Sequence, residues 1–178
     1  MMEGGPLQFK PMRSPVGALR LVASDRGLAA VVWENDRPGR VPLGPMAQGT
    51  NDLLNEAERQ LSGYFESAVR AFELPLDFRG TDFQRQVWSA LLEIPFGETR
   101  SYGDIARSIG RPTACRAVGA ANGRNPISIV APCHRVIGHS GGLTGFAGGI
   151  EAKRYLLELE RAALSRDRPA RATQVSRG

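Results

Sequence analysis

The sequence predicts an α+β protein, in which a small N-terminal unit of sheet plus helix precedes a mainly helical C-terminal unit. Three patterns support this class: apolar residues alternate before residue 34, they recur at helical spacing farther on, and residues 101–123 have helix-turn-helix spacing. The 178 residues are enough for one large domain or two small ones, and 42% of them are hydrophobic, so a real core is expected.

The N-terminal unit begins with a predicted hairpin. Residues 19–24 alternate, with Leu19, Leu21 and Ala23 on one face, and residues 28–33 form a second strand-like run after the turn at residues 25–27. Residues 37–49 contain three Pro and three Gly and are predicted to be a loop.

A helix is predicted to begin after that loop, at Asn51. Its apolar face consists of residues at helical spacing: Leu53, Leu54, Ala57, Leu61, Tyr64 and Phe65. Residues 72–78 return to an extended pattern, which completes the unit.

A domain boundary is predicted near Gly80, which gives an N-terminal domain over 1–80 and a second, mainly helical domain over 81–164. Residues 165–178 have almost no apolar content and are predicted to be a disordered basic tail.

The first helix of the second unit is predicted from Thr81 and Gln84, which have the spacing of a capping box. Its predicted buried face contains Phe83, Val87, Trp88, Leu91 and Leu92. It should end at Ile94, because a residue before Pro avoids the helical region.

Two short helices are predicted next. Ser101 and Asp104 form a second cap-like start, the helix should end at Gly110, and Pro112 suits the first turn of a third helix that reaches residues 122–123. Helix-turn-helix spacing alone is weak evidence, because many helical hairpins share it. Five Arg against one acid between residues 100 and 124 favour phosphate contact, although a solvated basic face would have the same composition.

The remaining chain is predicted to form short strands and loops over residues 126–150, followed by an amphipathic helix over Glu151–Ala163. The predicted buried residues of that helix are Ala152, Tyr155, Leu156 and Leu159.

Composition argues against several classes of protein. Two cysteines are too few for a secreted disulfide scaffold, and with only two histidines they match no common structural metal site, so no metal is expected. No Gly-rich phosphate loop follows a strand and no nicotinamide or flavin motif is present, so no cofactor is expected either. There is no apolar run of membrane-spanning length and no signal-peptide core, so we expect a cytoplasmic protein, monomeric when free.

The segment Pro132-Cys133-His134-Arg135-Val136 carries the main chemical signal. A cysteine attacks as its thiolate, and His134 and Arg135 provide a base and a positive charge beside it. Consecutive residues on a strand point to opposite faces, so contact between Cys133 and His134 needs a turn or a bridging water. A small buried cysteine beside two incidental polar residues is the alternative.

This segment resembles the active-site signature of the O6-alkylguanine-DNA alkyltransferases. Three further stretches fall where the family has its helix-turn-helix and hinge, namely residues 101–104, 116–119 and 125–126. Two later stretches, residues 145–149 and 156–160, fit its substrate loop and final helix. The resemblance is dense over residues 81–162 and looser over residues 8–78.

The resemblance implies a winged-helix-like C-terminal domain and repair of DNA by direct reversal. The alkyl group of O6-alkylguanine, and by extension O4-alkylthymine, is expected to move to Cys133 in a single turnover without a cofactor. The implied partner is double-stranded DNA, approached from the minor groove, from which the damaged nucleotide is flipped.

The same resemblance assigns roles to individual residues. Cys133 matches the alkyl acceptor, His134 the base that activates it through a water, and Glu160 the acid that orients the histidine. An exposed acid at the end of a helix is the alternative for Glu160. Asn125 matches the hinge residue, for which an ordinary Asn-Pro turn is the alternative.

The remaining assignments concern the substrate. Tyr102 matches the tyrosine that hydrogen-bonds the flipped base, and main-chain groups of Cys133, Val136 and Ala147 match those that read the guanine edge. Arg116 matches the arginine that fills the vacated stack. A core tyrosine and a simple phosphate contact are the alternatives for Tyr102 and Arg116. The expected DNA contacts also include Thr113, Ala117, Arg124 and Arg135.

Two positions depart from the pattern, and one cysteine has no expected role in the chemistry. Phe146 stands where many relatives have Tyr, so an apolar wall remains but a hydroxyl is lost. Ala131 stands where relatives often have Val or Ile, which should loosen packing beside the nucleophile. Cys115 is expected to be a small packing residue of the recognition helix.

Three other classes compete with this interpretation: a lesion-binding protein without an acceptor, a helix-turn-helix regulator and a cysteine hydrolase. Cys133 argues against the first, and the chain lacks the length and the cysteines of the fused regulators. The adjacent Cys133 and His134 differ from the widely separated Cys and His of hydrolases.

Overall fold

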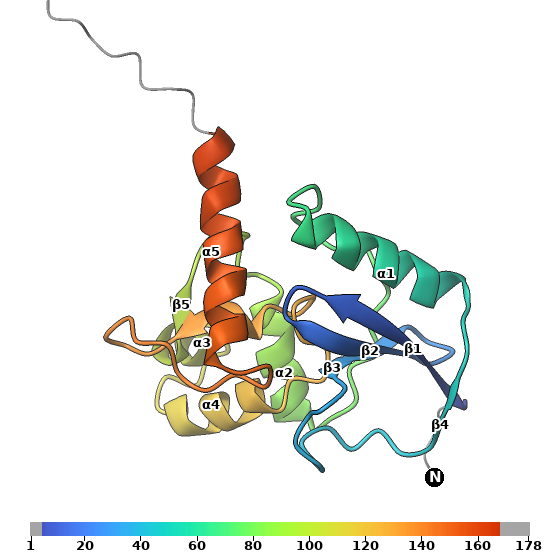
Figure 1. Ribbon diagram of the computed structural model, residues 1–178. Helices are drawn as coiled ribbons and strands as arrows, with labels where there is room; N and C mark the ends of the chain where they lie inside the picture. The colour runs from blue at the N-terminus through green and yellow to red at the C-terminus, as the bar shows by residue number, and fades with distance from the viewer. Residues whose placement is uncertain (1–4, 168–178) are drawn as a thin grey trace, which may run out of the picture.

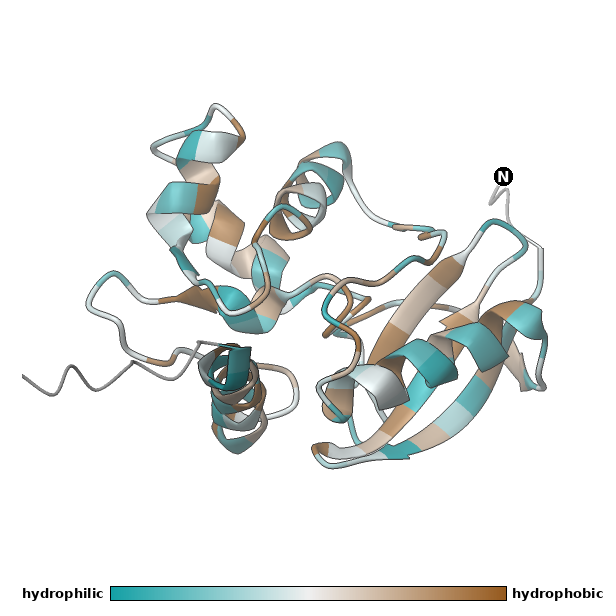
Figure 2. Ribbon diagram, turned by 90° about the horizontal axis from the view of Figure 1, so that it is seen from above, coloured by the Kyte–Doolittle hydropathy of each residue, from teal (hydrophilic) through white to brown (hydrophobic). Residues whose placement is uncertain are grey.

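The computed structural model describes residues 5–167 and confirms the α+β class. A four-stranded sheet covered by helix α1 lies on one side, helices α2, α3 and α4 lie on the other, and the long helix α5 stands beside them (Figure 1). The same division is visible from above in Figure 2, where α5 is seen end-on. Within residues 5–167 no helix is both long and apolar enough to cross a bilayer.

The sheet has the order β3-β2-β1-β4, with β1 Leu7–Ser14, β2 Gly17–Ala23, β3 Leu28–Trp33 and β4 Met46–Gln48. The predicted hairpin is confirmed as β2 and β3, which pair antiparallel. Strand β1 was not predicted, and β4 lies in the predicted loop. Strand β4 pairs with Leu7, Gln8 and Phe9. Among residues 5–167 no strand pairs with the outer edge of β1 beside Pro11, where a residue without an N–H is tolerated.

Helix α1, Asp52–Phe65, begins as predicted, because the Asn51 side chain accepts a hydrogen bond from the backbone N–H of Leu54. Residues 72–78 are extended but join the sheet only through an isolated bridge between Leu28 and Leu76.

Helix α2, Asp82–Leu91, has the predicted capping box between Thr81 and Gln84. It ends earlier than expected, with Leu92 as C-cap. The placement of Leu92 on the buried face was wrong: the residue is 42% exposed, because it is the C-cap and the helix has ended.

The helix-turn-helix is present as α3, Tyr102–Ser108, and α4, Cys115–Gly123. Ser101 and Asp104 form the second capping box, as predicted. Helix α4 begins later than predicted from Pro112, because residues 111–114 are held in a turn by the bond from Ala114 N–H to the Arg111 carbonyl.

The segment after α4 contains the one-turn 3₁₀ helix η1, Cys133–Arg135, and strand β6, Val136–Ile137, which pairs with β5, Arg100–Ser101. Helix α5, Ile150–Asp167, is longer than predicted. Residues 165–167 are therefore helical and not part of a disordered tail, while residues 168–178 lie outside the described residues. Tyr155 is 39% exposed, so its predicted burial was wrong.

The core runs between the sheet, α1 and the last third of the chain. Leu21 and Val31 of the sheet share an apolar cluster with Ile127 and Ile129 and with Leu156 of α5. Backbone hydrogen bonds join Val31 to Pro126 and Ser128, which fastens the segment before Cys133 to the edge of β3. The division into domains near Gly80 stays a prediction, because this cluster contains residues from both sides of it.

Candidate active site

Two tight turns shape the backbone that leads to Cys133. Ile129 has φ +74°, and the Val130 N–H bonds the Ser128 carbonyl across it, which is a γ-turn of the strained, positive-φ kind. Pro132, with φ −81° and ψ 67°, is the centre of an inverse γ-turn closed by Cys133 N–H and the Ala131 carbonyl. Helix η1 follows directly, so Cys133 and His134 lie on a turn, as their predicted contact requires.

The thiol of Cys133 is enclosed. The residue is only 4% exposed and packs in the cluster that contains Val118 of α4 and Val136. Burial raises the pKa of the Cys133 thiol, against the opposing effects of the Asn125 amide, Arg40 and Lys153. The residue is therefore a thiol at neutral pH and needs a base before it can attack.

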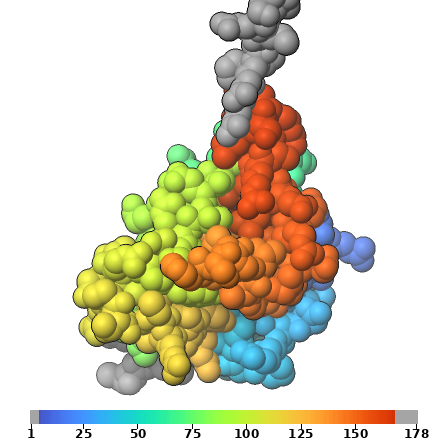
Figure 3. All heavy atoms as spheres, turned by 90° about the vertical axis from the view of Figure 1, so that its left-hand side faces the viewer, coloured from blue at the N-terminus to red at the C-terminus, as the bar shows by residue number. Residues whose placement is uncertain are grey.

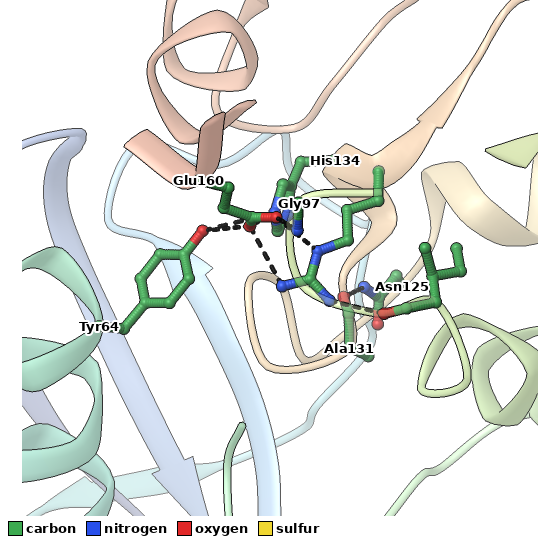
Figure 4. Close-up of polar contacts among 8 residues, drawn as sticks. Tyr64, Gly97, Asn125, Ala131, His134 and Glu160 are labelled. Carbon is green, nitrogen blue, oxygen red and sulfur yellow. Dashed lines mark hydrogen bonds and ion pairs between the residues drawn. The ribbon is translucent and has the colours of Figure 1, made fainter. Parts of the chain in front are cut away.

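His134 is oriented by Glu160. His134 Nε2 lies 2.6 Å from Glu160 Oε2, and both side chains are buried (Figure 4). The alternative for Glu160, an exposed acid, is thereby wrong. A carboxylate only accepts, so Nε2 carries the proton and donates it. The other ring nitrogen, Nδ1, is buried and has no hydrogen-bond partner within residues 5–167, which leaves its lone pair free to accept a proton.

Glu160 is held by donors from several parts of the chain. Besides His134, its oxygens accept hydrogen bonds from the Tyr64 hydroxyl at 2.6 Å and the Gly97 N–H at 2.8 Å. Arg135 donates through Nε at 2.8 Å and Nη2 at 3.2 Å. Although burial opposes it, the hydrogen bond from His134 and the bonds from Arg135 lower the pKa of Glu160 to about 2. Glu160 is thus a carboxylate throughout the neutral range.

The pKa of His134 is lowered by its burial, while Glu160 acts in the opposite direction. The ring is consequently neutral at pH 7, and the adjacent carboxylate can stabilise the imidazolium that forms when a proton arrives. His134 and Glu160 therefore have the geometry of a base and an orienting acid, and Cys133 directly precedes His134 on helix η1.

The prediction that Arg135 contacts DNA is not compatible with its position. The residue is 5% exposed, and its third hydrogen bond, from Nη1, goes to the Ile94 carbonyl at 2.7 Å. The physical reason is the buried carboxylate of Glu160, which requires a positive charge beside it. Arg135 therefore supports the relay from inside the protein.

Asn125 is fully buried at the end of the α4 segment. Its Nδ2 donates to the Ala131 carbonyl at 2.8 Å (Figure 4). Its Oδ1 accepts from the Ile127 N–H at 3.1 Å. The same side chain favours the thiolate of Cys133. This exceeds an ordinary Asn-Pro turn, because one amide joins the end of α4 to the backbone that precedes the nucleophile.

A cavity of about 500 Å³ collects three of the predicted substrate residues, Tyr102, Phe146 and Ala147. Its walls also include Arg37 and Arg40 from the loop after β3. Figure 3 shows this face, where the orange loop around residues 138–148 lies between the yellow helical segment and the light-blue loop after β3. The Tyr102 hydroxyl lies 2.5 Å from Thr144 Oγ1 of the orange loop.

Phe146 forms an aromatic wall of this site. Its ring packs edge-on against Trp33 with centroids 5.3 Å apart, and the His134 ring lies 6.5 Å from it. Val136, predicted to read the base through its main chain, is buried, and its carbonyl accepts a hydrogen bond from Lys153 Nζ at 2.7 Å.

The other predicted DNA-contacting residues are exposed on or beside α4: Thr113, Arg116, Ala117 and Arg124. Helix α4 therefore presents a face on which one basic side chain is flanked by small residues. Cys115 is also exposed on this helix, so its expected role in packing was wrong.

Sequence reasoning missed two buried polar residues of the site. Tyr64 was assigned only to the apolar face of α1, although a buried tyrosine hydroxyl usually needs a partner. Lys153 was not singled out; it is fully buried, burial lowers its pKa, and its Nζ donates to the Val136 and Thr144 carbonyls. The burial of Lys153 could have been predicted from its position in α5. It follows Ala152 and lies one turn before Leu156, and both of these residues are buried in the same helix.

Comparison with known proteins identifies similar families over almost the whole described chain. Residues 9–78 match the family model described as 6-O-methylguanine DNA methyltransferase, ribonuclease-like domain, and residues 82–162 match the corresponding DNA binding domain. The chain is 47% identical over 163 residues to a methylated-DNA–protein-cysteine methyltransferase of Mycobacterium bovis, covering 90% of this chain and 96% of that protein.

An archaeal relative and a solved structure extend the comparison. A protein of the same name from Methanosarcina acetivorans is 46% identical over 154 residues, which cover 86% of this chain and 98% of the relative. The crystal structure of Mycobacterium tuberculosis OGT in complex with DNA superposes with a TM-score of 0.79 at 47% identity, covering 88% of this chain and 94% of that one.

Proposed function

The chain belongs to the 6-O-methylguanine DNA methyltransferase family, and we propose that it repairs alkylated DNA by transferring the alkyl group from guanine O6 to its own Cys133. The observation that carries the assignment of residues is the buried Cys133, followed on one turn of helix by His134, whose Nε2 is fixed by Glu160.

The chemical step uses groups that the site provides. The thiol proton of Cys133 moves to His134 Nδ1, through the bridging water implied by the family resemblance, and Glu160 stabilises the imidazolium. The sulfur then attacks the alkyl carbon, an S–C bond forms and the C–O6 bond breaks. The guanine leaves with the electron pair of that bond and takes up one proton on its ring, which balances the proton that His134 removed from the thiol.

The reaction is stoichiometric for a chemical reason. The product at Cys133 is a thioether, which has no carbonyl for water to attack, so hydrolysis cannot restore the thiol. One chain therefore repairs one lesion, and the activity is that of a methylated-DNA–protein-cysteine methyltransferase working once.

We assign the recognition of DNA to α4 and to the adjacent cavity. Arg116 would occupy the stack from which the damaged nucleotide is flipped. Thr113, Ala117 and Arg124 would contact the DNA backbone beside it. Tyr102, Phe146, Ala147 and the main chain of Val136 would receive the base, and Asn125 would connect the two sites. Approach from the minor groove, acceptance of O4-alkylthymine and action in the cytoplasm belong to the same proposal.

Intact mass measurement tests the function directly. The protein is incubated with excess duplex DNA that contains one O6-methylguanine, and with the undamaged duplex as control. We expect a single added methyl group per chain with the damaged duplex only. Methyl release into solution without a protein adduct, or an unmodified protein in the presence of unrepaired DNA, would contradict the proposal.

A further inference from the structure

We propose that Tyr64, which reaches the site from helix α1 in the N-terminal half of the chain, is a positioning residue that sets the basicity of His134. The inference deepens the proposed function and rests on it. The residue does not contact the reacting atoms in this scheme and would act through Glu160.

The geometry places two donors on one oxygen. The Tyr64 hydroxyl and His134 Nε2 each lie 2.6 Å from Glu160 Oε2, and they are 3.5 Å from each other (Figure 4). Since the carboxylate only accepts, both groups donate to it. The hydroxyl thus competes with the imidazole for the charge of the same atom.

This competition has a defined direction. A hydroxyl that donates to Oε2 withdraws charge from it and weakens the stabilisation that Glu160 gives to the imidazolium of His134. Without the hydroxyl, Oε2 would face the ring with more of its charge, and the ring would be protonated at higher pH. Tyr64 therefore adds to the effect of burial in favouring neutral His134, which is the form that can accept the thiol proton.

Other ionisable groups around the relay oppose or support this effect but do not depend on Tyr64. Arg135 from η1 and Lys153 from α5 disfavour a positive charge on His134, while Glu160 favours it. Cys133 is the residue directly before His134. Tyr155 of α5 raises the pKa of Tyr64 and is the smallest of the contributions to that shift. The change of Tyr64 to Phe leaves all of these groups in place.

The hydroxyl is held firmly and stays a donor. Tyr64 is fully buried, with its ring packed against Phe65, Phe72 and Phe96 at centroid distances of 5.5, 5.6 and 6.2 Å. Burial, reinforced by Glu160, raises the pKa of the phenol, so it remains protonated where a histidine titrates. Phenylalanine would retain this packing and remove only the oxygen.

The test is a pH titration of the two histidine rings by NMR in wild type and in Tyr64→Phe. The chain contains only His134 and His139, and the exposed His139 is an internal reference. We expect the midpoint of His134 to rise by about 0.5–1 pH unit in Tyr64→Phe, with that of His139 unchanged. Tyr155→Phe, which removes a half-exposed hydroxyl from α5, should leave both midpoints in place.

A second variant protects the test against a folding defect. Replacing Tyr64 by 3-fluorotyrosine keeps the hydroxyl and makes it a stronger donor, so the midpoint of His134 should fall. The acid limb of the single-turnover rate should move with the midpoint in each variant. An unmoved or oppositely moved midpoint of His134 in the folded variants would overturn the role of Tyr64. Transfer by wild type is scored separately by intact mass, so failure of the proposed function is distinguished from failure of this inference.

Discussion

Glu160 and Arg135 form a buried ion pair, in which Arg135 Nε lies 2.8 Å from Glu160 Oε1 and both side chains are excluded from solvent. Such a pair depends on both members, because removing one leaves the other as an uncompensated charge in the interior. Since the same carboxylate also fixes His134, stability and chemistry are joined in one side chain.

The first prediction concerns Glu160→Gln. The variant keeps the shape of the side chain but leaves the Arg135 guanidinium without a counter-charge, so the free energy of unfolding should fall by about 3 kcal/mol. The single-turnover rate at neutral pH should also fall, because the imidazolium of His134 loses its carboxylate. Urea unfolding and quenched-flow transfer measure the two effects. The matched control is Glu158→Gln on the exposed side of α5, which should change neither quantity.

The second prediction concerns acid. The pKa of Glu160 is lowered from 4.5 to about 2 in the folded protein, so the folded state binds its proton less readily than the unfolded chain does. Its contribution to stability is complete above pH 4.5 and is lost as the pH falls toward 2. Thermal unfolding between these limits should therefore show a steeper loss of stability in wild type than in Glu160→Gln. Parallel curves for the two proteins would mean that Glu160 titrates normally.

The third prediction separates the two cysteines. Cys133→Ser should bind damaged duplex but gain no methyl group, because a serine hydroxyl is a far weaker acid than a thiol and His134 does not deprotonate it. Cys115→Ser, the matched change on the exposed surface of α4, should be methylated at the rate of wild type. Intact mass and peptide mapping give both results, and a methyl group found on Cys115 in wild type would disprove the assignment.

The fourth prediction concerns Arg116, which is exposed on α4. Arg116→Ala should slow repair of duplex DNA about 10-fold or more, since extrusion of a base costs a few kcal/mol and the guanidinium offsets part of that by filling the vacancy. It should hardly affect attack on free O6-methylguanine, which has no stack to leave.

The Arg116 experiment compares single-turnover rates on the two substrates at one stated salt concentration. Arg59→Ala, which removes an exposed arginine from α1, controls for the loss of one positive charge. Equal slowing on both substrates would show that Arg116 supports the fold or the active site.

Local signals in the sequence were sufficient for much of the helical architecture. Thr81 and Ser101 cap α2 and α3 as predicted, because a capping box involves only residues within one helical turn. Strand β1 was missed because it is stabilised by pairing with β2 and β4, while its own residues do not alternate clearly and include Pro11. The start of α4 depends on a turn that Pro112 alone does not specify.

The sequence pointed to a candidate nucleophile but not to the residues that surround it. Cys133 and His134 could be inferred from their chemistry, whereas the role of Glu160 came only from resemblance to a family. Arg135 was predicted to contact DNA because the sequence does not show whether a basic side chain points to solvent or into the protein. Tyr64 and Lys153 lie on the buried faces of their helices. The role of their polar groups could be recognised only once the hydrogen-bond partners were known.

The relay also constrains the order in which the active site can form during synthesis. Tyr64 and Glu160 are 96 residues apart, and the loop-closure entropy of so distant a contact makes its formation slow. Because a ribosome releases the N-terminal part first, Cys133 emerges before the helix that holds Glu160. A chain stopped before residue 150 would carry the cysteine without an oriented base. Transfer to Cys133 through the proposed relay is thus possible only after α5 has been synthesised and has brought Glu160 to His134.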